Sequence, residues 1–121
     1  MLTLFLYISA LDRKIVLLQD FQPLCAIATT SIGADRLRSI CQPNNPVWVP
    51  RSLSSIAGVQ AYSGSLKSHV AELWQSHRAF VFCLATGAVV RIVAPLLQSK
   101  ATDPAVVVVD EAGKFVVSLC G

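Results

Sequence analysis

The order of apolar and polar positions divides this chain into two kinds of segment. Uninterrupted apolar runs such as LCAIA, VWVP, AFVFCLA and AVVVV alternate with segments in which apolar residues recur at helical spacing. Apolar runs without polar alternation are typical of strands in the middle of a parallel sheet that helices cover on both faces. The predicted strands are residues 24–29, 47–50, 79–85, 105–110 and, after a tight turn at Glu111, Ala112 and Gly113, residues 114–120.

The segments between these runs predict helices over residues 31–41, 65–76 and 87–98. The clearest stripe is that of Leu66, Val70, Leu73 and Trp74, which recur at i, i+4, i+7 and i+8. Side chains that can cap a helix start precede two of the helices: Thr29, Thr30 and Ser31 before the first, and Ser63 or Ser65 before the second.

Two further segments carry a local prediction. Pro95 has no N–H group and its ring clashes with the carbonyl of Arg91, so the third helix should bend there. Residues 51–63 contain polar residues throughout and no continuous apolar run, although Val59 and Tyr62 are apolar, and we predict that they form a loop.

The alternation of strands and helices predicts the fold class. It is that of an α/β protein with a three-layer, Rossmann-like open sheet, mainly parallel and ending in a β-hairpin. Ligands bind such sheets beyond the carboxyl ends of the parallel strands, where the turns 29–33 and 85–87 lie. Asp110 and Glu111 should reach the same edge. The first turn, TTSIGA, has one glycine and not the triplet of a dinucleotide site.

The chain of 121 residues is long enough for one domain, which we assign to residues 23–121. Residues 1–22 form an N-terminal extension of uncertain structure, either a strand or a short helix. Asp12, Arg13 and Lys14 interrupt its apolar run after eleven residues. A run of this length is too short to cross a bilayer. The run also lacks the basic start and the cleavage site of a signal peptide, the less favoured alternative.

Composition narrows the function. Apolar residues make up 54% of the chain and charged residues 14%, which excludes disorder. The net charge of +3 is scattered, so it favours small anions slightly and gives no indication of nucleic acid. Cys25, Cys41, Cys83 and Cys120 are not spaced as metal ligands, and we predict free thiols in a reducing cytoplasm. His69 and His77 are predicted to be exposed or half-buried, without a metal.

The last forty residues combine several motifs. They contain ATGAVVRIVAPLL, then a Lys-x-x-Asp-Pro link and an Asp-Glu-x-Gly hairpin within KATDPAVVVVDEAGKFVVSL. This order and spacing resembles the N-terminal region of the cobalt-precorrin 5A hydrolase family of cobalamin biosynthesis. The resemblance is dense from Gly64 to Gly121, looser from Leu24 to Tyr62, and absent over about the first twenty residues.

The resemblance implies an enzyme of corrin ring contraction. In the family, water opens a lactone on the cobalt-bearing macrocycle and acetaldehyde leaves; the cobalt belongs to the substrate, so no cofactor is expected. A fused or neighbouring precorrin methyltransferase is a further implied partner, and neither nucleic acid nor a membrane is expected. In the family the last strand continues into a Gly-His and Gly-Gly-containing loop. We therefore expect residues 23–121 to be an incomplete part of a longer enzyme, with weak corrinoid binding and little acetaldehyde release.

The alternative is a non-catalytic module that binds a tetrapyrrole intermediate or docks a partner enzyme of the pathway. The candidate substrate-binding residues are Thr86, Gly87, Arg91, Lys100 and Asp103, and the candidate general bases are Asp110 and Glu111. Each has a structural alternative. Asp110 and Glu111 suit an ordinary hairpin turn, and Lys100 and Asp103 suit a loop before a strand.

Arg91 and the Thr86–Gly87 pair are each open to two interpretations. A guanidinium can hold a substrate acetate or propionate, or it can form an ion pair with Asp103 or Asp110, or lay its stem on the core. The N–H groups of a helix that starts at Thr86 and Gly87 can bind a carboxylate or a developing oxyanion. Alternatively, the helix start is capped and needs a small residue there for close packing.

Overall fold

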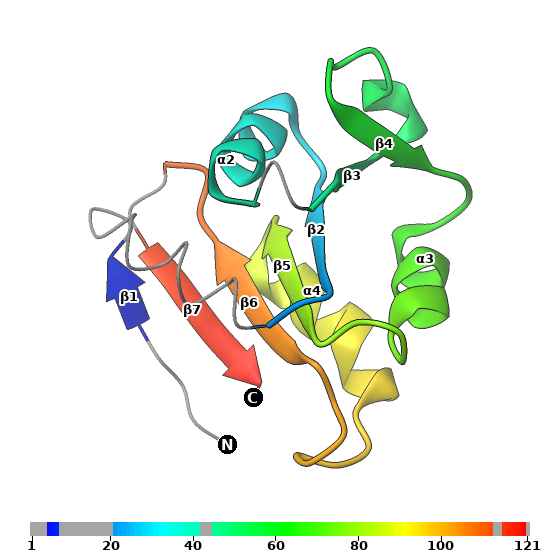
Figure 1. The fold of residues 1–121 in the computed structure, drawn as a ribbon, viewed down its shortest axis with the longest axis vertical. Coiled ribbons are helices and arrows are strands. Elements are labelled where there is room, and N and C mark those ends of the chain that lie inside the picture. The colour runs from blue at the N-terminus through cyan, green and yellow to red at the C-terminus, as the bar shows by residue number, and fades with distance from the viewer. Residues whose placement is uncertain (1–4, 8–20, 42–44, 113–114, 121) are drawn as a thin grey trace.

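The computed structural model describes residues 5–7, 21–41, 45–112 and 115–120. Within these residues, seven strands form one sheet in the order β1-β7-β6-β5-β2-β3-β4 (Figure 1). Strands β2 to β6 are parallel, β7 runs antiparallel to β6, and β1 runs antiparallel to β7. The strands are β1 (Phe5–Tyr7), β2 (Leu24–Ala28), β3 (Val47–Pro50), β4 (Val59–Tyr62), β5 (Ala79–Cys83), β6 (Ala105–Val109) and β7 (Phe115–Cys120).

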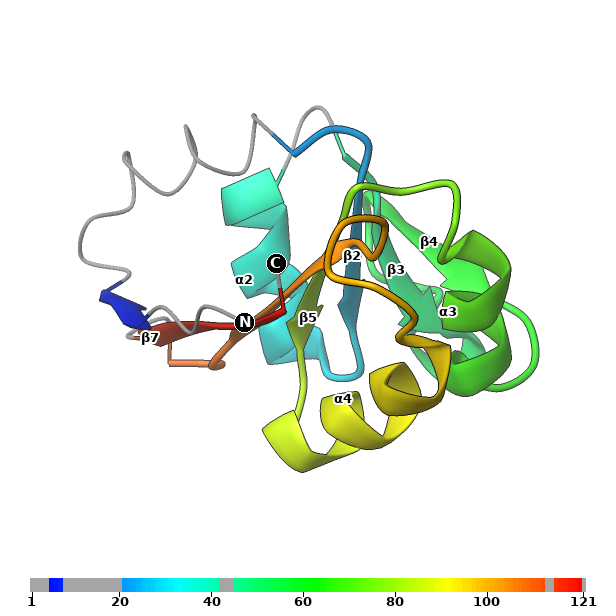
Figure 2. The ribbon, with the colours of Figure 1, turned by 90° about the horizontal axis from the view of Figure 1, so that it is seen from below.

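Helices cover both faces of this sheet, as the three-layer prediction requires. Figure 2 shows α2 (Ser31–Cys41) on one side and α3 (Leu66–Leu73) and α4 (Thr86–Val93) on the other. Every residue of β2 and β5 is buried, because both strands have neighbours on each edge and helices over each face. The predicted α/β fold, mainly parallel and ending in a β-hairpin, is confirmed.

The two faces of the sheet carry separate apolar cores. On the α2 side, Ala34, Leu37 and Ile40 of the helix pack on alternate strand residues such as Val81. On the other side the larger side chains gather, with the aromatic rings of Trp74, Phe80 and Phe82 and the valines of α4. Because successive side chains of a strand point to opposite faces of the sheet, each apolar run contributes residues to both cores.

The structure agrees with most predicted boundaries. Helix α2 covers the predicted residues, and β2, β3, β5 and β6 begin where the apolar runs begin. The second helix is shorter than predicted, from Leu66 to Leu73, and Ser65 caps it by accepting a hydrogen bond from Ser68 N at 3.1 Å. The third helix ends at Val93 and continues as the 3₁₀ turn η3 (Ala94–Leu96), because Pro95 has no N–H group to donate to the carbonyl of Arg91.

The prediction of a loop over residues 51–63 is wrong. This segment contains the 3₁₀ turn η2 (Arg51–Leu53) and strand β4, which pairs with β3 from Val47↔Val59 to Pro50↔Tyr62. Strand β4 lies at the edge of the sheet, so Gln60 and Ala61 stay exposed and no apolar run is needed. Near the other edge, the N-terminal segment supplies strand β1; residues 8–20 lie outside the described residues.

Candidate functional site

Three turns of the described chain meet beyond the carboxyl ends of the parallel strands. Strands β2, β5 and β6 lie side by side in the sheet and end at Ala28, Cys83 and Val109. The turns that follow them lead into α2, into α4 and into β7. Asp110 and Glu111 therefore reach the edge from which both helices start, as the sequence predicts for a parallel β6.

A pocket of about 380 Å³ opens at this edge, on the side of α4. Its wall is apolar where the residues just after β5, the end of β6 and the middle of β7 contribute, and polar at Thr86, Asp110 and Glu111. The lining residues are Leu84, Ala85, Thr86, Val108, Val109, Asp110, Glu111 and Val117. The structure thus brings together Thr86 and both candidate general bases.

Glu111 is held from the side of α2. Its Oε2 accepts a hydrogen bond from Thr30 Oγ1 at 3.1 Å, and the same hydroxyl oxygen accepts one from Gly33 N at 3.0 Å. Thr30 is thus the predicted cap of α2. Nη2 of Arg36, on the second turn of α2, donates to the carbonyl of Ala112 at 3.5 Å. These two long-range hydrogen bonds attach the start of α2 to the turn that carries the carboxylates.

The start of α4 presents backbone donors beside the pocket. Ala85 precedes the helix and offers no side-chain cap, so no side chain of the described chain satisfies the first-turn N–H groups. A methyl group at Gly87 would meet no atom within 4 Å, so close packing does not explain this glycine. An uncapped helix start is suited to a carboxylate or an oxyanion.

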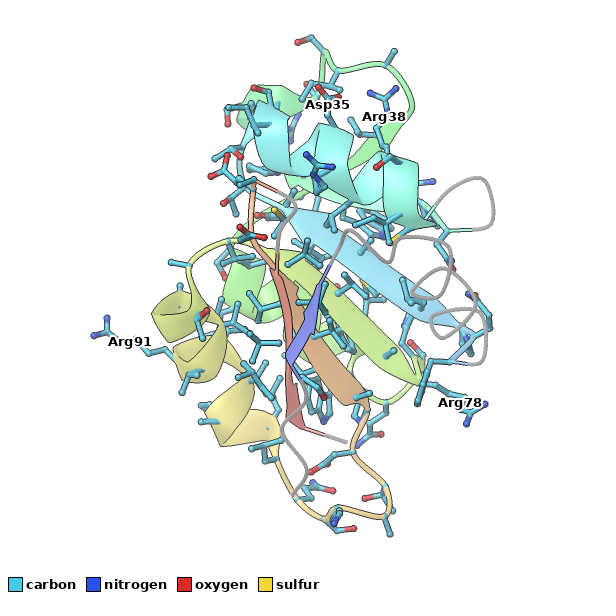
Figure 3. The ribbon with its side chains drawn as sticks, turned by 90° about the vertical axis from the view of Figure 1, so that its left-hand side faces the viewer. Asp35, Arg38, Arg78 and Arg91 are labelled. Atoms are coloured by element: carbon cyan, nitrogen blue, oxygen red, sulfur yellow. The ribbon has the colours of Figure 1, made fainter. Side chains whose placement is uncertain are left out.

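Arg91 lies away from the pocket. It is exposed on the outer face of α4, and Figure 3 shows its side chain pointing away from the sheet. The salt bridge between described residues joins Arg38 to Asp35 at 3.2 Å, and Arg91 pairs with neither Asp103 nor Asp110. The ion-pair interpretation of Arg91 is therefore wrong, and its role in substrate binding stays a prediction.

Lys100 and Asp103 lie at the opposite end of the parallel strands from the pocket, beside the start of β6. They belong to the loop between η3 and β6, and β6 begins with a hydrogen bond from Ala105 N to Arg78 O at 3.0 Å. Oδ2 of Asp103 accepts hydrogen bonds from Gln98 N at 2.9 Å and from Ser99 N at 3.1 Å, so it orders that loop. The structure does not bring these two residues together with Thr86, Asp110 and Glu111.

The site includes three residues that sequence reasoning did not select. Thr30 was predicted only as a cap, and Arg36 has the pattern of an ordinary charge on a helix surface. Cys83 ends β5 beneath the turns. Burial, together with Glu111 and Asp110, raises the pKa of the Cys83 thiol to about 11, and Arg36 offsets part of that rise. The charge of Arg36 therefore influences the same thiol as the charges of the two carboxylates.

Among the described residues, no group of three or more His, Cys, Asp and Glu side chains comes together. Cys25, Cys41 and Cys83 are buried and unpaired, as predicted; the side chain of Cys120 is outside the description. The prediction that His69 is exposed or half-buried is wrong, because the residue is 8% exposed and its ring contacts those of Trp48 and Tyr62. His77 is half-buried beyond the end of α3. No helix in the described ranges has the length and apolar character to span a membrane.

Comparisons with known proteins agree with the resemblance carried by the C-terminal half. The protein family described as cobalamin synthesis G N-terminal matches residues 68–121. A cobalt-precorrin-5A hydrolase of Priestia megaterium is 43% identical over 61 residues, which is 50% of this chain and 16% of that protein. One from Salmonella typhimurium is 40% identical over 62 residues, which is 51% of this chain and 18% of that protein.

Among solved structures, a cobalamin biosynthesis protein G homologue from Sulfolobus solfataricus aligns with a TM-score of 0.47 at 24% identity, over 74% of this chain and 26% of that one. The matched segment spans less than a fifth of the length of either curated relative. Over residues 68–121 this chain is therefore similar to the N-terminal part of the cobalamin synthesis G family, and about half of it is similar to cobalt-precorrin-5A hydrolases.

Proposed function

We propose that this chain acts in cobalamin biosynthesis, in the hydrolytic opening of the lactone of cobalt-precorrin 5A with release of acetaldehyde. One observation carries the proposal: the pocket joins an apolar wall, two carboxylates and an uncapped helix start at the ligand edge of the sheet. The relatives named as cobalt-precorrin-5A hydrolases support the substrate class.

The size and lining of the pocket suit part of a macrocycle. Pockets of about 300–1,000 Å³ enclose most of a drug-sized ligand, so this pocket holds the lactone-bearing side of the ring and leaves the rest outside. Val108, Val117 and Leu84 offer the apolar wall against which that side lies. Arg91, on the outer face of α4, can reach only a carboxylate that extends beyond the pocket. Lys100 and Asp103 have no part in this proposal.

Lactone opening needs a base and a group that stabilises the oxyanion. Glu111, with Asp110 as the second candidate, takes a proton from water while the hydroxide oxygen bonds to the lactone carbonyl carbon. The first-turn N–H groups at Thr86 and Gly87 stabilise the negative charge on the carbonyl oxygen. The carbon–oxygen bond of the ring ester then breaks. The proton held by the carboxylate passes to the leaving oxygen, which leaves a carboxylic acid and a hydroxyl group on the substrate, and the acid then loses its proton to water. The two-carbon unit that bears the hydroxyl group leaves as acetaldehyde: the hydroxyl group loses its proton, the C=O bond forms, and the carbon–carbon bond to the macrocycle breaks, with its electron pair and a proton going to the macrocycle.

The binding site is tested by titrating the chain with a cobalt-corrinoid polycarboxylate and following the visible absorbance of the corrinoid. Val117→Asp places a charge on the apolar wall and should weaken binding at least tenfold, because an unpaired carboxylate resists burial. Val90→Asp, on the exposed face of α4, is the matched control and should bind like the wild type. If the wild type does not bind, or both variants bind equally, the proposed site is wrong.

The chemistry is tested by measuring acetaldehyde released from cobalt-precorrin 5A. Glu111→Gln should lower the rate by about 10²–10⁴-fold without a change in affinity, because it removes a general base and keeps the shape. Asp35→Asn alters a carboxylate on α2 outside the pocket and should have no effect. If the wild type binds the corrinoid but releases no acetaldehyde, the hydrolytic function is wrong and the chain is the non-catalytic binding module.

A further inference from the structure

The β6–β7 turn is attached to the start of α2 at two points. Thr30 Oγ1 bonds to Glu111 Oε2 at 3.1 Å, and Arg36 Nη2 bonds to Ala112 O at 3.5 Å. The partners are 81 and 76 residues apart in sequence, so folding of the sheet creates both contacts. One donor, Thr30, caps α2 and the other, Arg36, lies on its second turn, and both acceptors belong to consecutive residues of one turn.

The hydroxyl of Thr30 has a defined direction. Its oxygen accepts the N–H of Gly33, so its own proton is the one that points to Glu111. Hydrogen bonds in such a chain polarise one another, and the positive end of the α2 dipole stands behind this one. The contact therefore orients the Glu111 carboxylate as well as attaching it.

Arg36 makes the second hydrogen bond to the β6–β7 turn. Its side chain is half-buried, and its Nε is buried with no hydrogen-bond partner in the described chain. A guanidinium in this position loses hydration, and the hydrogen bond to the backbone carbonyl of Ala112 compensates for part of that loss. Arg36 is therefore placed to hold the turn through the carbonyl of Ala112.

The two faces of the sheet separate this attachment from the pocket. Helix α2 lies on one face, and the pocket opens beside the start of α4, which lies on the other (Figure 2). We propose that Thr30 and Arg36 are positioning residues, which hold the β6–β7 turn from the α2 side so that its carboxylates keep their place at the mouth of the pocket. The catalytic importance of this positioning rests on the function proposed above. The existence of the two hydrogen bonds does not depend on that function.

Substitutions at Thr30 separate capping from positioning. Asparagine and aspartate both cap helices well, but asparagine can also donate a hydrogen bond to Glu111, whereas aspartate cannot and repels it. We expect the amides of Glu111 and Ala112 to exchange their hydrogens about tenfold faster in Thr30→Asp than in the wild type. Thr30→Asn and Thr30→Ser should stay within about twofold of the wild type. Equal exchange in Thr30→Asp and Thr30→Asn would overturn the positioning role of Thr30.

Arg36→Met keeps the apolar stem and removes the donor, and it should raise the same exchange rates several-fold. Arg38→Met is the matched control, because Arg38 lies on the same helix but bonds to Asp35. If Arg36→Met and Arg38→Met exchange alike at the turn, Arg36 does not position it. Unchanged amide exchange in α3 will show that each variant is folded.

A kinetic measurement connects the attachment to the reaction. With cobalt-precorrin 5A, Thr30→Asp should lower kcat with little change in KM, and Thr30→Ser should restore it, because the pocket wall is unaltered. Absence of turnover in the wild type contradicts the proposed function, and the exchange experiment then still decides whether the attachment exists. Faster exchange in Thr30→Asp together with an unchanged kcat would overturn the catalytic part of the proposal.

Discussion

At the scale of single residues, two glycines show how closely α2 approaches the sheet and how open α4 is. A methyl group at Gly33 would lie 3.1 Å from both Cys83 Sγ and Thr30 Oγ1, and 3.2 Å from the Cys83 carbonyl oxygen. Cys83 ends the central strand, so its backbone cannot move aside cheaply. At Gly87 a methyl group would meet nothing within 4 Å. The first glycine is required by packing, and the second is not.

Alanine at these two positions should therefore have opposite effects on stability. Gly33→Ala should lower the free energy of unfolding by about 1–3 kcal/mol, because the added methyl group overpacks a close contact. Gly87→Ala should leave it unchanged or raise it by up to about 1 kcal/mol, because alanine favours the helix. Urea unfolding followed by circular dichroism measures both. Similar midpoints for the two variants would show that α2 can move away from β5.

At the scale of elements, α3 packs through a histidine against the edge strand β4 and its neighbour β3. The ring of His69 stacks on Tyr62 with 4.8 Å between ring centroids and lies 4.6 Å from the ring of Trp48. Its Nε2 is buried without a hydrogen-bond partner among the described residues. Burial lowers the pKa of His69 below its ordinary value of 6.5, Glu72 opposes this, and His77 adds to it. The contact between helix and strands therefore depends on an uncharged ring.

This contact should make stability depend on pH. The unfolded chain protonates His69 near pH 6.5, whereas the folded chain does so only at a lower pH. Between these two pKa values the unfolded state binds more protons, so the free energy of unfolding falls as the pH drops below about 6.5. His69→Phe keeps an aromatic ring between Trp48 and Tyr62 and should remove this component, while His77→Gln should keep it. Chemical denaturation between pH 5 and 8, in the range of histidine titration, tests the difference.

At the scale of the whole molecule, the two cores enclose the described thiols. Cys25 lies in the core on the α3 and α4 side, and Cys41 and Cys83 lie in the core on the α2 side. Burial raises the pKa of Cys25 and of Cys41 to about 12, with the neighbouring Cys41 adding to the rise at Cys25. The folded molecule therefore keeps these groups as unreactive thiols, since the thiolate is the nucleophile.

The rate of thiol modification should report unfolding of the whole domain. In a Cys120→Ser variant, which leaves the three described cysteines, a disulfide reagent at pH 8 should react slowly with the native protein and rapidly in denaturant. Above pH 9, the ordinary pKa of a thiol, the unfolded chain ionises and the folded chain does not, so stability should fall as the pH rises. Fast labelling of the native protein at any of the three thiols would contradict the enclosed cores.

The sequence alone determined most of the elements and the fold class, because hydrophobic periodicity is local. The apolar runs located β2, β3, β5 and β6, and the threonine and serine caps located α2 and α3. The same periodicity also explains Arg91: Val89 and Val93 face the core, and a residue two positions from each lies about 200° away around the helix, toward solvent.

Only the tertiary structure decided the edge strand and the site. Strand β4 exists because β3 offers it a backbone ladder, and no pattern in residues 51–63 encodes that partner. The candidate bases could be placed at the ligand edge from sequence, because a short connection makes β6 parallel to β5. The hydrogen bonds that Thr30 and Arg36 make to Glu111 and Ala112 could not be predicted. They join residues 81 and 76 apart, and they depend on how closely Gly33 lets α2 approach β5.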